Sequence, residues 1–541
     1  MRPDTINALP RVSARGDDMP TTNVVNLDAM IRRADLASPS DASEEVPALS
    51  IPQLEKSGFL YPALRKPDFQ RETAHWSPEQ VADLIGTFTR RDLIPAVILW
   101  RAGQNVFVID GAHRLSALIA WVHDDYGDKE LSLRFFQDIP DEQIAAAEKT
   151  RMLVNSAVGS YRDHKLALEH PDRVKAEIAE RANRIGWQPI PAQWIQTHDH
   201  SRAENSFFRI NQGGTRIDPT EGRILKARSS ATALASRAIL RAGGGHNYWD
   251  KFEEAVQARI EELGKEIYDL LFSPTLDLPI KTLDVPLAGQ GYGPHVLPLL
   301  FDLVNVANDV PVPDSSHKKI TKADELPPDP DGKQTINFLI NTRAMVWRIC
   351  SAHASSLGLH PALYVYSPSG IFQPGALLTF VTLLKGWDTP EFRAFTKVRA
   401  KFEKFLLANR GITEAVRKLG SGSRSRPRIL ALYRKIIAEI DAGKTVTEIK
   451  DSLAKDQDFA FLVAEPPPKI SAKGRNFRRE TKGGAFLRDA LPRASKCPTC
   501  GGLMHRNGMQ SGHREHRRHG GNNSIDNAHM QHPFCDSTMN Q

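Results

Sequence analysis

Cysteine is scarce in this chain. Only four of its 541 residues are cysteines, and three of them, Cys497, Cys500 and Cys535, lie close to the C-terminal end. So small and uneven a set excludes a disulfide framework and is typical of a metal site in a reducing compartment. The fourth, Cys350, stands alone in an apolar helical stretch, where we expect a buried core thiol.

Long apolar segments are missing as well. No run approaches the roughly 20 residues that a transmembrane helix needs, and residues 1–20 lack the apolar core of a signal peptide. Hydrophobic residues make up 40% of the chain and charged residues 25%, which is typical of globular protein. The length is sufficient for several domains. We therefore expect a cytoplasmic protein without a membrane partner.

Acidic residues are sparse in one part of the C-terminal region. The formal net charge is +7, and much of the excess lies between Lys469 and Arg518, where lysine and arginine dominate. A basic stripe of this density fits the phosphate backbone of nucleic acid. A solvated linker is the alternative, but the adjacent cysteine and histidine cluster favours nucleic acid.

The residue pattern divides the chain into four segments. Residues 1–50 are polar and have no sustained period, which predicts a disordered segment. Residues 51–230 are compact and mixed, and residues 231–465 are mostly helical in period. A proline-rich break at 465–469 predicts a linker to the last segment, 466–541. The expected fold class is a multidomain α+β protein.

Local patterns place elements in the second segment. Ser77, followed by a proline, is typical of a helix N-cap. Two β-branched runs, 95–100 and 105–109, predict a hairpin. Asp110 and Gly111 then turn the second strand into a helical run.

That turn carries a polar cluster, Asp110-Gly-Ala-His-Arg114. A glycine at the turn lets the backbone approach a ligand, and the helix N-terminus supplies amide donors that suit phosphate. Arg114 adds a planar fork for phosphate oxygens. Taken alone, such a pattern is more often a structural turn followed by a surface arginine.

Two further pieces accompany this turn. Asp68-Phe-Gln-Arg71 lies before the first helix, and Phe207-Phe-Arg-Ile-Asn211-Gln-Gly-Gly214 precedes a helix that contains Glu221. Together, over about residues 55–230, the three pieces resemble the ParB/sulfiredoxin-like domain of GmrSD-type restriction enzymes, a family that includes SspE-like defence nucleases. Its "DGQQR" turn has two glutamines where this chain has Ala112 and His113.

The resemblance implies a domain that binds a nucleoside triphosphate. Because the turn departs from the family pattern, the resemblance supports binding of the nucleotide more than its hydrolysis. The residues that it places around the nucleotide are Arg71, Asp110, Gly111, His113, Arg114, Asn211, Gly214 and Glu221.

The C-terminal segment contains two short pairs of metal ligands, Cys497-Pro-Thr-Cys500 and His532-Pro-Phe-Cys535. Four ligands in two such pairs can close a tetrahedral zinc site. A purely structural zinc ribbon is one interpretation of this pattern.

The residues between the two pairs favour a second interpretation. His513, a Gly-Gly loop at 520–521, Asn527 and a final Cys535-Asp536 resemble the HNH endonuclease family, whose core is a ββα-metal fold. The resemblance implies a histidine on the first strand, an asparagine before the second strand and a metal ligand at the start of a helix.

Roles follow from that resemblance and from chemistry. His513 would be the general base, and Asn527 would orient the loop and hold His513 by a hydrogen bond. Asp536 would bind Mg²⁺ or Mn²⁺ beside the separate zinc. The family has an aspartate where this chain has Gly512, so the ion would need Asp536 together with Glu515, His516 or another nearby group.

The leading hypothesis is a metal-dependent DNA endonuclease of a bacterial antiphage restriction system. In it, an N-terminal nucleotide-binding domain gates HNH cleavage of phage or modified DNA, with a second copy or a defence-system protein as a possible partner. The alternative is a non-catalytic DNA-binding regulator that combines a ParB-like domain with a structural zinc ribbon. The set His513, Asn527 and Asp536 separates the two, because a zinc ribbon needs none of them.

Overall fold

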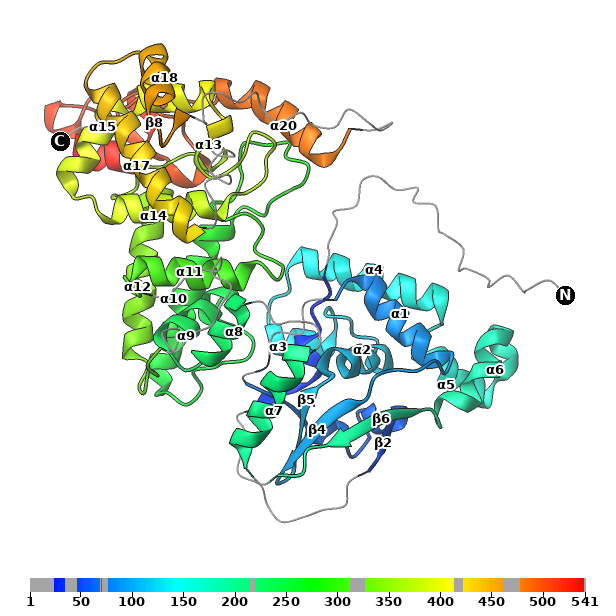
Figure 1. Cartoon of the computed structure of the whole chain (residues 1–541). Helices are drawn as coiled ribbons and strands as arrows, with labels where there is room; N and C mark the ends of the chain where they lie inside the picture. The colour runs from blue at the N-terminus through cyan, green and yellow to red at the C-terminus, as the bar shows by residue number, and fades with distance from the viewer. Residues whose placement is uncertain are drawn as a thin grey trace.

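An α/β part and a larger helical part lie side by side in the molecule (Figure 1). The computed structural model describes residues 24–34, 46–68, 70, 76–197, 199–213, 219–311, 326–412, 422–460 and 477–539. Among the helices of these ranges, none has the length and apolar character that crossing a membrane requires.

The α/β part is built on a mixed six-stranded sheet of order β1-β3-β5-β4-β6-β2. Strands β4 and β5 form an antiparallel hairpin around Gly103, as predicted, while β3 pairs parallel to β5 and β6 parallel to β4. The strands are β1 (Arg32–Ala34), β2 (Ala48–Ser50), β3 (Leu64–Pro67), β4 (Val97–Ala102), β5 (Asn105–Asp110) and β6 (Pro189–Trp194).

The two edges of this sheet come from the segment that the sequence predicted to be disordered. That prediction is wrong for residues 24–34 and 46–50, which contain β1 and β2. Val25, Met30 and Ile31 are each 1% exposed in the core. The apolar stretches are too short to show a period, and they are stabilised by pairing with strands distant in sequence, β3 and β6.

Helices cover both faces of the sheet. Along β5, Val106 and Val108 point into one apolar cluster while Phe107 and Ile109 point into another, as the two-residue period of a strand requires. The first cluster lies under α1 and α2, and the second under α7 and α8. These helices are α1 (Pro78–Thr89), α2 (Ala112–His123), α3 (Glu130–Phe136), α4 (Asp141–Ala157), α5 (Tyr161–Glu169), α6 (Ala176–Ile185), α7 (His200–Gly213) and α8 (Pro219–Lys226).

A capping box marks the start of α1, and a glycine turn marks the start of α2. The predicted N-cap of α1 is confirmed: Ser77 and Gln80 form a capping box. Helix α2 follows Gly111 directly, and the predicted turn from strand to helix is confirmed there.

The helical part extends through the middle of the chain, as its period predicts. Its helices are α9 (Ala231–Leu240), α10 (Glu254–Phe272), α11 (Val296–Ala307), α12 (Lys333–Ile349), α13 (Pro361–Tyr364), α14 (Pro374–Lys385), α15 (Thr389–Ala408), α17 (Gly422–Asp441), α18 (Val446–Lys455) and α20 (Arg479–Ala490). Cys350 is buried in this core, which confirms the prediction for it.

The boundary predicted near residue 466 does not separate two hydrophobic cores. A single apolar cluster extends from α9 to the C-terminal region and includes Leu487, Leu503 and Phe534. The linker predicted at 465–469 lies outside the described residues. The C-terminal region therefore packs on the helical part and shares its core.

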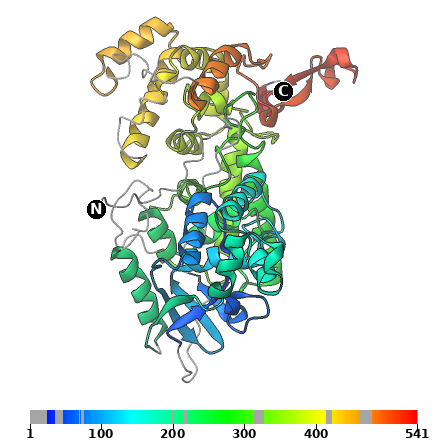
Figure 2. The same ribbon diagram turned by 90° about the vertical axis from the view of Figure 1, so that its right-hand side faces the viewer.

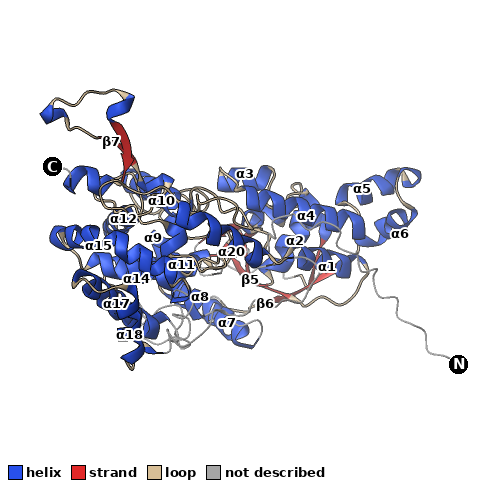
Figure 3. Ribbon diagram, turned by 90° about the horizontal axis from the view of Figure 1, so that it is seen from above, coloured by secondary structure: helices blue, strands red, loops and turns tan. Residues whose placement is uncertain are grey.

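One element projects from this shared body. Strands β7 (Gln510–His513) and β8 (Ala528–Gln531) form an antiparallel hairpin, which extends away from the helices (Figures 2 and 3). A single π-helical turn, Cys535–Met539, follows it. The β7–β8 hairpin and the loop that joins its strands thus form an exposed arm, which carries His513 and Asn527.

Candidate metal centre and catalytic hairpin

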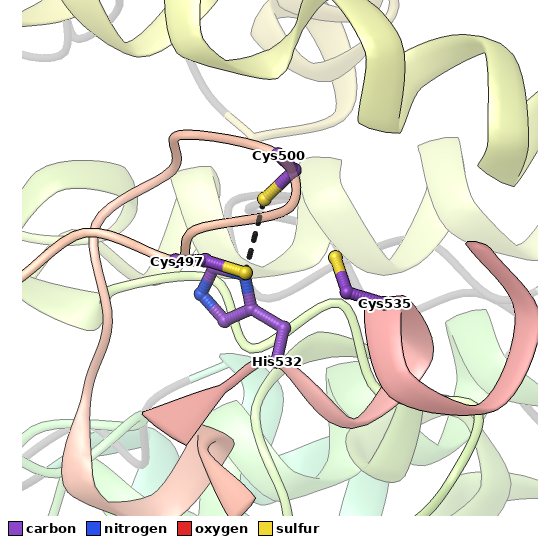
Figure 4. A group of neighbouring side chains, drawn as sticks. All are labelled: Cys497, Cys500, His532 and Cys535. Carbon is purple, nitrogen blue, oxygen red and sulfur yellow. Dashed lines mark hydrogen bonds between the residues drawn. The ribbon is translucent and has the colours of Figure 1, made fainter. Parts of the chain in front are cut away.

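Cys497, Cys500, His532 and Cys535 meet in one cluster, as the sequence predicts. Their possible ligand atoms all lie within 4.8 Å of one another, and the four side chains converge (Figure 4). Three thiols and one imidazole in this arrangement suit a tetrahedral ion such as zinc. The cluster therefore fits a metal site.

A tight turn presents the first pair of ligands. The Cys497 amide donates to the carbonyl of Gly502 at 2.8 Å, and the Gly501 amide donates to the carbonyl of Cys497 at 2.8 Å. Gly501 has a φ of +69°, a conformation that favours glycine. This backbone aims both thiols inward, while His532 and Cys535 enter from the end of β8.

The surroundings of His532 fix which ring nitrogen faces the thiols. Its Nε2 lies 3.1 Å from the carbonyl oxygen of Leu503, which can only accept a hydrogen bond. The proton is therefore on Nε2, and the lone pair is on Nδ1, which lies 3.2 Å from the Cys500 sulfur and 3.2 Å from Arg399 Nη1. A metal-binding histidine commonly donates its other nitrogen to a carbonyl in this way.

The thiols influence one another strongly. Contacts with Cys500 and Cys535 hold the pKa of the Cys497 thiol well below its usual value, and contacts with Cys497 and Cys500 raise the pKa of Cys535. Ionisation of one thiol disfavours ionisation of its neighbour, because negative charges at this distance repel each other. A bound cation removes that conflict.

Helix α15 anchors the cluster to the body. Arg399 is 1% exposed; its Nη1 lies 3.2 Å from His532 Nδ1, and its Nε donates to Glu403 at 2.7 Å. Glu403 in turn accepts from the Leu503 amide at 2.5 Å and from the Tyr364 hydroxyl at 2.9 Å. The sequence does not reveal this buried pair, because its partners are distant along the chain.

His513 stands at the end of β7 and is partly exposed. Its Nε2 lies 3.1 Å from the side-chain oxygen of Asn523, which also accepts from Arg517. The expected hydrogen bond from Asn527 to His513 is wrong, because Asn527 is engaged by the loop backbone and Asn523 takes that position.

Asn527 holds the loop between the strands. Its amide nitrogen donates to the carbonyls of Glu515 at 3.0 Å and Asn522 at 2.7 Å, and its oxygen accepts from the Glu515 amide at 2.7 Å. These bonds close the loop around the Gly-Gly pair. They agree with the loop-orienting part of the predicted role.

Asp536 lies beneath the hairpin with both carboxylate oxygens in hydrogen bonds. Gln531 donates to Oδ1 at 2.6 Å and Gln510 donates to Oδ2 at 2.7 Å. A Cβ at Gly512 would lie 2.8 Å from Oδ1 of Asp536 and 1.9 Å from the Gln531 amide nitrogen. The backbone of residue 512 thus adjoins Asp536, and the Gln531 amide fills the space that a side chain there would need.

The N-terminal turn is held together by its own residues. Gly111 has a φ of +90°, and a Cβ there would lie 2.8 Å from Val97 Cγ1. Arg114 forms an ion pair with Asp110 at 2.8 Å and donates to the carbonyl of Ala96 at 3.0 Å. In this structure Arg114 fastens the turn.

The structure describes only some of the other residues that were predicted to surround a nucleotide. His113 stacks on Trp76 with ring centroids 5.6 Å apart. Asn211 belongs to α7 and Glu221 to α8, but their side chains lie outside the described residues, as do Arg71 and Gly214 entirely.

The helical part touches the elements around this turn. Arg241 pairs with Asp28 at 3.0 Å, and His246 Nε2 lies 3.0 Å from Asp68. The second contact reaches the segment that leads to Arg71. A cavity of about 890 Å³ lies at the same junction, lined among others by Asn26 and Arg241.

Comparison with known proteins bears on this N-terminal part. Residues 53–229 match the family model described as GmrSD restriction endonuclease, N-terminal domain. This part is GmrSD-like. The match begins after β1 and β2 and ends before α9, so it covers the sheet from β3 to β6. The GmrSD-like part links the chain to a restriction-endonuclease family.

No curated protein and no solved structure matches the chain. The interpretation of the C-terminal cluster and hairpin therefore rests on their geometry.

Proposed function

We propose that the chain is a DNA endonuclease of an antiphage restriction system, and that the β7–β8 hairpin is its HNH-type cutting element. The observation that carries the proposal is the projecting hairpin with His513 and Asn527, which joins a cysteine and histidine cluster at its base, where Asp536 lies. The GmrSD-like match supports a nuclease of a restriction system independently.

The hairpin offers the groups that phosphodiester hydrolysis needs. His513 is accessible to a water molecule and serves as the general base. Asn527 keeps the loop in place, so that the base and the phosphate meet in a fixed geometry.

Asp536 suits a hard divalent ion. Each of its oxygens accepts one amide hydrogen, so that each keeps a further lone pair. An ion of this kind often uses one or two carboxylates, with water and substrate phosphate as its other ligands. When bound, it supplies positive charge for the developing negative charge on the phosphate.

The zinc has a separate task in this proposal. Cys497, Cys500, His532 and Cys535 hold it and fix the base of the arm against Arg399. Exposed arginines on the arm, Arg514 and Arg518, face solvent where a DNA backbone can approach. DNA is the partner that this arrangement suits.

The GmrSD-like part acts as the regulator. A nucleoside triphosphate binds around the turn of Asp110, Gly111 and Arg114, and the contacts of Arg241 and His246 carry the change to the helical part. Because the cysteine and histidine cluster at the base of the arm packs on the helical part, a shift there can reach the arm. A second copy of the chain or another defence protein can also regulate cleavage.

The test is a cleavage panel with the full chain. Phage DNA with and without base modifications, and a supercoiled plasmid, are incubated with Mg²⁺ or Mn²⁺ in the presence and absence of each nucleoside triphosphate. Cleavage that requires the divalent ion is expected. Intact DNA under every condition, with DNA binding retained, contradicts the proposal and supports a non-catalytic DNA-binding regulator.

A further inference from the structure

Gly512 leaves the proposed ion site short of one ligand, and the structure explains why no side chain can supply it from that position. The Gln531 amide occupies the space, 1.9 Å from where a Cβ would stand. Gln531 is fully buried, donates to Asp536 and accepts from the Thr499 hydroxyl at 2.9 Å, so that both ends of its amide are held. A neighbouring position on the same face of the hairpin can supply a further protein ligand instead.

The strand register identifies that neighbour. Gly512 stands opposite His529, and Gln510 stands opposite Gln531. Residues directly opposite in an antiparallel pair share a face, as do residues two apart along one strand. Gln510 and Gln531 both contact Asp536, which places His529 on the face that carries this carboxylate.

His529 has a ring nitrogen with no visible partner. Its Nε2 is shielded from solvent and makes no hydrogen bond in the part of the chain that the structure describes. By contrast, His513 is bonded to Asn523 and His532 to Leu503. A buried polar atom without a partner is unfavourable, and it often marks a position where an ion or a water belongs.

We propose that His529 and Asp536 together hold the catalytic ion, with His529 taking the place of the side chain that Gly512 lacks. This rests on the proposed nuclease function of the arm. The ligand set is then one imidazole nitrogen and one carboxylate. Imidazole favours transition metals, whereas Mg²⁺ prefers oxygen ligands. The site therefore takes a transition-metal cation such as Mn²⁺ or Co²⁺ in preference to Mg²⁺.

Metal binding by the zinc-loaded full chain tests this proposal without reference to cleavage. Titration with Mn²⁺, followed by electron paramagnetic resonance, gives the affinity of the second site. His529→Ala is expected to weaken Mn²⁺ binding by roughly tenfold or more. Loss of a residue that only hydrogen-bonds to a metal ligand already weakens affinity by about this factor. His529→Asp is expected to shift the preference toward Mg²⁺.

Matched variants control the experiment. His519→Ala removes an exposed histidine from the segment that joins β7 to β8 and is expected to bind Mn²⁺ as the wild type does. His513→Ala, which removes the general base, is expected to keep Mn²⁺ affinity and lose cleavage. His529→Gln, with zinc content measured in parallel, replaces His529→Ala if the latter loses zinc.

The outcomes separate this proposal from the nuclease function. If the zinc-loaded His529 variants bind Mn²⁺ with wild-type affinity, and His529→Asp leaves metal preference unchanged, His529 is not a ligand even though the nuclease proposal stands. If wild type cleaves no DNA under any condition, the nuclease function itself fails.

Discussion

The two candidate sites of this molecule differ in what supports them. The N-terminal turn around Asp110 lies within a matched family model, yet its arginine is occupied by its own carboxylate and by a backbone carbonyl. The C-terminal arm lies outside that match, yet its ligands converge within 4.8 Å. Family similarity and site geometry are thus independent arguments, and each site of this chain has one of them.

The same contrast appears in how the two sites are attached. The turn belongs to a sheet whose core is separate from the main helical cluster. The cysteine and histidine cluster packs on α15 and shares the core of the helical part. Damage to the second site is therefore expected to cost more stability than damage to the first.

The largest effect is expected from Cys535→Ser. Three remaining ligands cannot close a structural zinc site, and such sites contribute roughly 10–16 kcal/mol of binding free energy. We expect loss of zinc and a large fall in melting temperature, measured by metal analysis and calorimetry. Cys350→Ser is the control, because this buried thiol lies outside the cluster and the variant should keep its zinc.

A smaller loss is expected from Arg399→Ala. The variant leaves the Glu403 carboxylate buried without its cation, which typically costs about 3–5 kcal/mol. Denaturant unfolding measures the difference. Arg393→Ala, on the exposed side of the same helix, should stay within about 0.5 kcal/mol of wild type. Equal stabilities of the two variants would contradict the anchoring role of Arg399.

Gly111→Ala tests the N-terminal turn. Its positive φ and the contact with Val97 predict a loss of about 1–3 kcal/mol. Gly443→Ala is matched, because Gly443 has a φ of +84° but a Cβ there meets nothing within 4 Å. It should be less destabilising, since only backbone strain remains. The reverse order in thermal unfolding would contradict the tight packing described for the turn.

The smallest effect on stability is expected from Arg114→Ala. Its partly exposed ion pair with Asp110 is worth about 1 kcal/mol or less. If the turn binds nucleoside triphosphate, the variant should nevertheless lose that binding in calorimetry. If the variant is stable and its nucleotide affinity is unchanged, Arg114 has only a structural role and the turn is not the nucleotide site.

Features set by local sequence were predictable. The capping box at Ser77, the hairpin around Gly103, the turn at Gly111 and the two ligand pairs all depend on residues a few positions apart. Each was visible because its spacing alone carries the information.

Features set by contacts across the chain were not predictable. Strand β1 gains its stability from β3 and could not be inferred from its own short stretch. The pair Arg399 and Glu403 supports a cluster about one hundred positions later. The partner of His513 and the face of His529 depend on a loop and a strand register that spacing alone does not fix.

Cleavage by His513→Ala tests the central claim most directly. Wild type and variant are prepared with equal zinc content, and their rates of plasmid cleavage are compared with Mn²⁺ present. The account predicts that the variant retains its fold and zinc while cleavage falls by roughly 10²–10⁴-fold, the contribution typical of a general base. Equal cleavage rates would contradict the assignment of cutting to the arm.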